Sequence, residues 1–129
     1  MTNNKKNLTS YEDVLAASAK WRLCFNSENA AGCAASYHPD ATMIVTNSGT
    51  YCGLNEIEHF WKELIEMGAK EVCYDNLYIR VIDDNTVALS CDWSMNVAKG
   101  KVLLEKWRKQ KNGEWLLIFD EFCITERNV

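Results

Sequence analysis

The spacing of apolar residues changes near Lys70, and this change constrains the fold more than any other feature of the sequence. Before this residue, apolar side chains recur at the interval of an α-helix; after it, they alternate along the chain with a period of about two. Helices are therefore expected first, followed by a run of strands joined by short turns. That order is typical of an α+β domain in which helices cover an antiparallel sheet.

Three helices are expected in the first part of the chain. The sequence TSYE, residues 9–12, is a capping box, so a first helix should begin there and run to about Asn26. An Ala-rich helix follows, with Ser27 as its cap and its end near Tyr37. The clearest helix is GLNEIEHFWKELIEMG, residues 53–68, which has its apolar residues on one face and ends at a glycine.

A small hairpin and a four-stranded meander complete the expected elements. The segments ATMIVT and TYC, separated by Asn47-Ser48-Gly49, predict two short paired strands. From Lys70 onward, strands are expected at about 70–82, 86–98, 101–111 and 114–126, with turns at Asp84-Asn85, Lys99-Gly100 and Asn112-Gly113. No linker or repeat divides the chain, which predicts one domain over residues 1–129 with residues 1–7 disordered.

Charge and cysteine spacing exclude several classes of partner. The 14 basic and 18 acidic residues give a net charge of −4, which argues against nucleic acid or an anionic membrane as a partner. No long apolar run and no secretory leader pattern is found, so a cytoplasmic protein is expected. The 6 cysteines lack the CxxC or CxxxH spacing of a metal or redox site. The sequence therefore predicts no metal and no cofactor.

The last expected strand, EWLLIFDEFCI, carries two adjacent carboxylates among apolar residues. Strict alternation would place Asp120 on one face with Leu116, Ile118 and Phe122, and Glu121 on the other. A carboxylate in such surroundings must accept hydrogen bonds, pair with a cation or stay protonated, because burying an isolated charge is very costly. Asp120 is therefore a candidate catalytic residue, with a structural, hydrogen-bonded role as the alternative.

A second candidate carboxylate, Glu105, lies in the preceding strand. The turn expected between residues 99 and 100 decides which residues of the strand before it share its face. A two-residue turn would place Asp92 and Ser94 there, whereas a three-residue turn would place Trp93 and Met95 there instead. Both registers stay open at the level of the sequence.

The order of the elements and two motifs make the chain resemble the nuclear transport factor 2-like superfamily, which includes ketosteroid isomerases, scytalone dehydratase and SnoaL-like polyketide cyclases. The motifs are HPDAT, within YHPDATMIV, and the W-R-K…N-G-x-W hairpin within EKWRKQKNGEWLLIFDEFCI, and the resemblance spans roughly residues 9–126. It implies a cone-shaped fold with three N-terminal helices packed on a curved, mainly antiparallel sheet. An apolar pocket in the cone and a homodimer are also implied.

Compared position by position, the resemblance carries over only part of the family's chemistry. In ketosteroid isomerases an Asp general base follows the DAT motif, and Val45 stands at the matching position. The oxyanion-hole Tyr of the first helix matches Trp21, and the second oxyanion donor, a carboxylic acid, matches Glu105. SnoaL-like cyclases place an acid/base Asp in the last strand, which matches Asp120. The pocket histidines of scytalone dehydratase have no counterpart on the expected strands.

The sequence favours a small-molecule-binding domain, and two functional classes stay open. In one, the chain is a cofactor-independent acid/base enzyme of isomerase, cyclase or dehydratase type, with Asp120 catalytic and Glu105 assisting. In the other, it is a non-catalytic ligand-binding or assembly domain with a structural carboxylate in its pocket. The expected ligand is a small apolar or aromatic molecule, and the expected pocket residues are Trp21, Phe25, Val45, Trp61, Trp93, Trp107 and Phe122.

Overall fold

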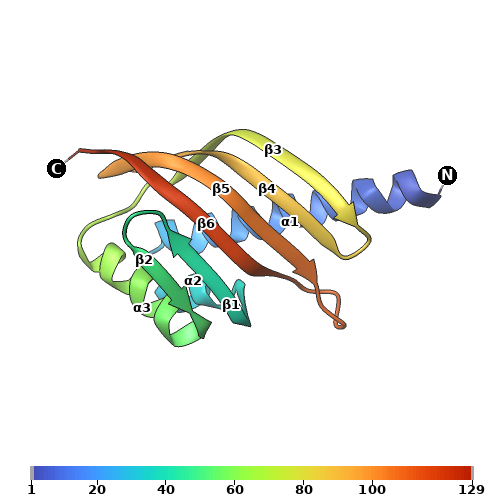
Figure 1. Cartoon of the computed structure of the whole chain (residues 1–129), viewed down its shortest axis with the longest axis horizontal. Helices are drawn as coiled ribbons and strands as arrows, with labels where there is room; N and C mark the ends of the chain where they lie inside the picture. The colour runs from blue at the N-terminus through green and yellow to red at the C-terminus, as the bar shows by residue number, and fades with distance from the viewer. Residues whose placement is uncertain (1, 129) are drawn as a thin grey trace.

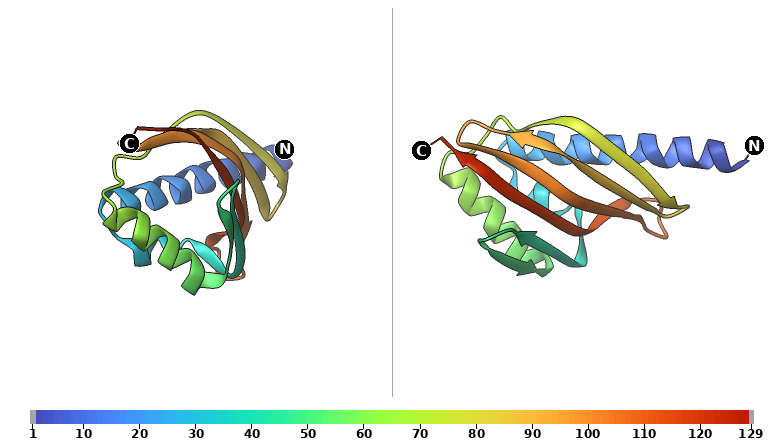
Figure 2. Two further views of the ribbon diagram at one scale, coloured as in Figure 1. Left: turned by 60° about the vertical axis from the view of Figure 1, so that its left-hand side comes forward. Right: turned by 45° about the horizontal axis from the view of Figure 1, so that its top comes forward.

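Helices cover the concave side of a single curved sheet (Figures 1 and 2). The structure is a computed structural model that describes residues 2–128, and the side chains of residue 5 and of residues 7–128. The helices are α1 (Thr2–Asn26), α2 (Ala30–Ala34) and α3 (Gly53–Glu66). The core lies between these helices and the sheet, so the predicted α+β architecture is confirmed.

The sheet has six strands in the order β2-β1-β6-β5-β4-β3. Neighbouring strands are antiparallel except for β1 and β6, which run parallel. The last four strands form the predicted meander, and the N-terminal hairpin adds to its free edge through β6. The strands are β1 (Tyr37–Val45), β2 (Gly49–Cys52), β3 (Cys73–Asp83), β4 (Thr86–Ser94), β5 (Ala98–Lys109) and β6 (Trp115–Arg127).

Several local predictions are confirmed. The hairpin of β1 and β2 forms, with Met43 opposite Tyr51. The turn at Asn112-Gly113 joins β5 to β6, with Gly113 at a φ of 89° that glycine adopts without strain. Helix α3 buries Ile57 and Trp61 against the sheet, as its apolar spacing indicates.

The start of the first helix differs from the prediction. Helix α1 begins at Thr2, so residues 2–7, expected to be disordered, form its first turns. Thr9 lies inside the helix and donates its hydroxyl to the carbonyl of Lys5 at 3.0 Å. Threonine makes this bond within a helix as readily as it caps one, so the capping-box pattern alone does not fix where the helix begins.

The second helix is shorter than predicted, and this changes the position of Tyr37. Its cap is Asn29 rather than Ser27, and the Asn29 side chain accepts a hydrogen bond from the N–H of Gly32 at 2.9 Å. Tyr37 belongs to β1, which also contains Pro39. A residue before proline favours extended backbone, so the His-Pro pair belongs to a strand rather than to a helix end.

A shift in pairing changes which residues of β6 face the helices. Between Leu117 and Phe119 the register of β6 against β5 moves by one residue. Leu117 is therefore buried together with Asp120, although strict alternation would put them on opposite faces. The prediction that Leu116 and Ile118 share the face of Asp120 is wrong, because alternation does not continue across the irregularity.

The predicted turn at Lys99-Gly100 is also wrong. Both residues lie within β5, and the chain reverses at residues 95–97. Gly100 lies opposite Trp93 of β4, and a Cβ atom here would overlap the carbonyl oxygen of Cys123 and crowd the Trp93 ring. This glycine marks a close approach of neighbouring groups rather than a turn.

We expect Gly100→Ala to lower the free energy of unfolding by about 1–3 kcal/mol, because the added methyl group overpacks the strand against Cys123 and Trp93. Urea unfolding measures this directly. Gly49→Ala is the matched control, since a Cβ there would meet the Tyr51 side chain only at an ordinary 3.5 Å. Equal losses of stability in the two variants would contradict the close-approach explanation.

Candidate functional site

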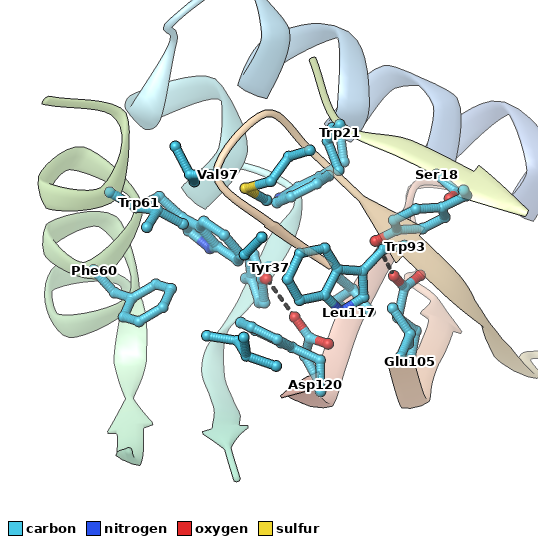
Figure 3. Close-up of a pocket in the computed structure, with 18 of the residues that line it drawn as sticks. Ser18, Trp21, Tyr37, Phe60, Trp61, Trp93, Val97, Glu105, Leu117 and Asp120 are labelled. Carbon is cyan, nitrogen blue, oxygen red and sulfur yellow. Dashed lines mark hydrogen bonds between the residues drawn. The ribbon is translucent and has the colours of Figure 1, made fainter. Parts of the chain in front are cut away.

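Two buried carboxyl groups lie side by side on the inner face of the sheet. Glu105 of β5 is directly opposite Asp120 of β6, so both side chains leave the sheet on the same face. They are 4% and 5% exposed. Figure 3 shows the two carboxyls next to one another at one end of the same pocket.

Aromatic side chains from other parts of the sheet donate hydrogen bonds to these carboxyls. The hydroxyl of Tyr37 donates to Oδ2 of Asp120 at 2.6 Å. The hydroxyl of Tyr74 donates to Oε2 of Glu105 at 2.8 Å, and the indole N–H of Trp107 donates to Oε1 at 2.9 Å. Both oxygens of Glu105 are thus hydrogen-bonded, whereas within the described residues only Oδ2 of Asp120 is.

Burial raises the pKa of both carboxyls. For Glu105 the loss of solvation outweighs the hydrogen bonds from Tyr74 and Trp107 and the charge of Arg22, which all lower its pKa. For Asp120, burial and then the charge of Glu105 raise the pKa to about 8, against the opposing hydrogen bond from Tyr37. Negative charge therefore develops first on Glu105, while Asp120 keeps its proton at neutral pH.

The two tyrosines remain protonated donors, and a cation lies near one of them. Burial raises the pKa of Tyr37 and of Tyr74 well above the ordinary value. The guanidinium of Arg22, on α1, lies 4.7 Å from the centre of the Tyr74 ring. Arg22 thus brings positive charge toward Glu105 without contacting it through a hydrogen bond in the described structure.

A cavity adjoins the carboxyls, with about 70 Å³ of space for the centres of water molecules. Five of the expected pocket residues line it: Trp21, Trp61, Trp93, Trp107 and Phe122. The expectation is wrong for Phe25 and Val45, which are buried outside the lining. Phe25 stacks behind Trp21 with ring centroids 5.5 Å apart, and Val45 pairs with Phe122 from the neighbouring strand.

The strand β4 presents the apolar alternative of the two registers left open by the sequence. Trp93 and Met95 line the cavity. Asp92 lies outside it and forms a salt bridge with Lys101 at 2.7 Å. Three residues, 95–97, connect β4 to β5, and this connection precedes the expected Lys99-Gly100 turn.

Tyr37 is the site residue that the sequence reasoning missed. It was placed at the end of a helix, whereas β1 carries it into the core, where it is 2% exposed and bonded to Asp120. The signal that could have found it is the proline two residues later, which favours extended backbone before it. Ser18 of α1, also buried, is a second cavity residue with no assigned role in the sequence.

Other kinds of chemistry lack a matching constellation in the described part of the chain. No group of three or more His, Cys, Asp or Glu side chains there could hold a metal ion. Burial raises the pKa of Cys33 and of Cys91 to about 12, so neither thiol ionises readily to a nucleophile. None of the described helices is both long and apolar enough to cross a membrane.

Solved structures of this shape are found, although no family model matches the sequence and no curated protein is significantly similar to it. A protein named as a candidate scytalone dehydratase, from Novosphingobium aromaticivorans, superposes with a TM-score of 0.81 at 14% identity, over 97% of this chain and 89% of the other. A nuclear transport factor 2-like protein with a cystatin-like fold, from the same organism, gives 0.78 at 14%, over 96% and 87%. The chain has the nuclear transport factor 2-like fold.

A ketosteroid isomerase-like protein from Erwinia carotovora atroseptica also matches this fold, with a TM-score of 0.76 at 13% identity over 88% of this chain and 95% of the other. The structure shows where two of the positions compared with ketosteroid isomerases lie within this fold. Trp21 forms part of the cavity wall, and Val45 is buried away from the lining. Neither supplies the base or the hydroxyl donor that the resemblance to ketosteroid isomerases would require.

We expect Asp120→Asn to remove a pH dependence of stability. The pKa of Asp120 is about 8 in the folded chain, whereas the unfolded chain releases this proton near the ordinary pKa of 3.8. Between these values the folded state binds more protons, so its free energy of unfolding falls as pH rises, by up to about 1.4 kcal/mol per pH unit. Asparagine cannot ionise, so this decline should be smaller in the variant.

Chemical denaturation at several pH values between 4 and 8.5 measures the difference, roughly spanning the two pKa values. Glu121→Gln is the control, because Glu121 is the next residue of β6 and lies outside the cavity. It should keep the wild-type slope. Equal slopes in wild type and Asp120→Asn would show that the Asp120 carboxyl is not held protonated.

Proposed function

We propose that this protein binds a small apolar or aromatic molecule in the cavity and acts on it by proton transfer, without a cofactor, with Asp120 as the acid/base residue and Glu105 assisting. The observation that carries the proposal is the burial of these two carboxyls side by side in a cavity walled by aromatic rings. Pairs of carboxyls whose surroundings separate their pKa values are suited to the roles of acid and base.

The hydrogen bonds support a division of roles between the two carboxyls. Asp120 holds a proton at neutral pH and has an oxygen left without a hydrogen bond in the described structure, so it is suited to donate to a ligand oxygen. The charge of Glu105, once it forms, raises the pKa of Asp120 further and so helps to keep Asp120 protonated. Glu105 lies directly opposite Asp120 on the neighbouring strand, so it is placed to act as the base for a C–H group of the same ligand.

The reaction class supported best is enolisation or its reversal. Glu105 takes a proton from carbon beside a carbonyl group, the electron pair forms a C=C bond, and the carbonyl oxygen takes the proton of Asp120. Glu105 then returns its proton either to another carbon of a conjugated system, which gives an isomer, or to a neighbouring hydroxyl that leaves as water, which gives a dehydrated product. In both cases the enol oxygen gives its proton back to Asp120 and the C=O bond re-forms. Two similar structures are named for dehydratase and isomerase chemistry of this general kind.

The size of the cavity limits the ligand. Its 70 Å³ of space for water centres corresponds to about five water molecules, or roughly 150 Å³ of liquid. A one- or two-ring molecule occupies such a volume, whereas a four-ring steroid is too large for it. The lining is aromatic, so a flat ring is the shape that packs best against it.

A non-catalytic ligand-binding or assembly domain is the alternative, and one observation favours it. Both oxygens of Glu105 and one oxygen of Asp120 already accept hydrogen bonds from the chain itself, as structural carboxyls do. In that case the carboxyls would fix the positions of Tyr37, Tyr74 and Trp107, and their ionisation would not affect any reaction.

Proton transfer can be tested with 2-tetralone, a two-ring ketone of suitable size, by following exchange of its C–H groups with solvent deuterium by NMR. We expect the wild-type protein to speed this exchange, and Asp120→Asn and Glu105→Gln each to slow it by about 100-fold or more. The rate should also fall as pH rises through about 8, because the acid form of Asp120 is then lost.

Glu121→Gln should leave the exchange rate unchanged, since its side chain does not line the cavity. Thermal unfolding of each variant separates loss of chemistry from loss of fold. If 2-tetralone binds and wild type and Asp120→Asn exchange its protons at the same rate, the catalytic role is wrong and the ligand-binding alternative holds.

We also propose that the chain is a cytoplasmic homodimer. Helices cover one face of the sheet, and large apolar side chains stay exposed on β3 and β5: Leu77, Tyr78, Ile82 and Leu103. Exposed apolar patches on a small domain mark interaction surfaces, and a second copy of the chain is the partner implied by the family resemblance. The single-domain organisation likewise stays a prediction.

Light scattering at micromolar concentration should give twice the chain mass of 14.8 kDa. The double variant Tyr78→Lys, Leu103→Lys should give the single-chain mass, because it places two charges on the exposed apolar surface. Glu126→Lys, at an exposed position near the end of β6, is the control and should remain dimeric. A wild-type mass of one chain would contradict the proposal.

A further inference from the structure

Several cavity residues carry hydrogen-bond donors that the protein itself does not use. Among the described residues, five buried side-chain polar atoms have no hydrogen-bond partner, and four of them belong to residues that line the cavity: Ser18, Trp21, Trp61 and Trp93. All four side chains are buried, with exposed fractions of 2–6%. Most buried polar groups are satisfied, so four in one cavity call for a common explanation.

The indole of Trp61 is the least available of these donors. It lies close enough to the Tyr37 hydroxyl to lower the pKa of that phenol, although no hydrogen bond of ordinary geometry joins them. Trp21 and Trp93 have no such neighbour in the described structure. An indole N–H can only donate, so these two positions require an acceptor.

The residues that carry the free donors line the cavity from two sides. Ser18 and Trp21 are one turn apart on α1, and Trp93 lies on β4 within the sheet, as Figure 3 shows. Of the two carboxyls in the cavity, Glu105 already accepts hydrogen bonds from Tyr74 and Trp107 at both oxygens. Asp120 accepts one from Tyr37 and keeps its own proton at neutral pH. A ligand with hydrogen-bond acceptors would pair with the free donors of the cavity, whereas a ligand with donors alone would find few acceptors there.

We propose that the natural ligand is a flat, neutral molecule of one or two rings with two oxygen acceptors on opposite sides, bound through the indole N–H groups of Trp21 and Trp93. This inference rests on the proposed function only in taking the cavity to be the ligand site. A ligand that brings an acceptor to these unpartnered donors gains hydrogen bonds that a purely apolar ligand cannot make. An anionic ligand is disfavoured, because Glu105 carries the charge that forms first in the cavity.

Three two-ring probes of similar size separate acceptor recognition from simple apolar packing. Chromone has a carbonyl oxygen and a ring oxygen on opposite sides, naphthalene has no polar atom, and indole has one donor and no strong acceptor. Titration of the ¹⁵N-labelled protein, followed by the NMR signals of its five indole N–H groups, gives affinity and contact together. We expect chromone to bind at least about fivefold more tightly than naphthalene or indole, and to shift the Trp21 and Trp93 indole signals most.

Trp21→Phe and Trp93→Phe keep a ring at each position and remove the N–H. Each should lower chromone affinity by about five- to tenfold and leave naphthalene affinity nearly unchanged. Trp115→Phe is the control, because the indole of Trp115 donates to Asp13 at 3.3 Å and does not line the cavity. The comparison of probes on the wild-type protein needs no variant, so it stands even if a variant unfolds.

Equal affinities for the three probes would overturn the inference, and so would the absence of chromone binding up to its solubility limit. Its failure is distinguishable from failure of the proposed catalysis. Selective chromone binding without any deuterium exchange of 2-tetralone would retain the donor site and reject proton transfer. Exchange that depends on Asp120, together with equal affinities for the probes, would retain proton transfer and reject acceptor recognition.

Discussion

The burial of two carboxyl groups on adjacent strands is the constraint on which the rest of the structure depends. Moving an ionised carboxylate out of water costs several kcal/mol unless hydrogen bonds replace its hydration, at roughly the scale of a whole domain's stability. Here the replacements come from β1, β3 and β5, through Tyr37, Tyr74 and Trp107. Because these donors lie far apart in the sequence, the carboxyls are satisfied only when the sheet has assembled around them. The carboxyl site therefore forms only together with the curved sheet.

The aromatic wall makes the carboxyl pair chemically different from two surface acids. Trp61 packs against Phe122 with ring centroids 5.7 Å apart, and Trp21 packs edge-on against Trp61 at 4.9 Å. This wall excludes water, so the repulsion between Glu105 and Asp120 is screened less than it would be at the surface. The result is that Asp120 keeps its proton at neutral pH. The same aromatic rings thus stabilise the fold by packing and determine the acid/base behaviour of the carboxyl pair.

The sequence predicts an element well where neighbouring residues determine its conformation. It predicts poorly where contacts between residues far apart in the chain determine the structure. The Asn112-Gly113 turn and the apolar face of α3 need only neighbouring residues, and both are confirmed. The expected grouping of Asp120 with Phe122 holds, since both are buried, but the grouping with Leu116 and Ile118 is wrong because the shift beside Leu117 breaks the alternation. Gly100 was taken for a turn because its crowding against Cys123 and Trp93 depends on strands that pair later. Tyr37 was missed for the same reason: its role exists only beside Asp120.

Where the chain departs from simple rules, the departures gather around one cavity. The irregular pairing of β5 and β6 brings Asp120 inward, and the buried indoles of Trp21 and Trp93 keep unused donors. Phenylalanine would fill almost the same space without an unsatisfied N–H, which costs about 1–3 kcal/mol when no partner is present. The local rules and the fold agree in α3 and in the Asn112-Gly113 hairpin. Departures from the local rules are expected to concentrate at functional sites, where a protein loses some stability by keeping polar groups that only a bound ligand hydrogen-bonds. Packing against Phe25, Trp61 and Phe122 accounts for the rings of Trp21 and Trp93, and the proposed ligand would account for their unpartnered N–H groups.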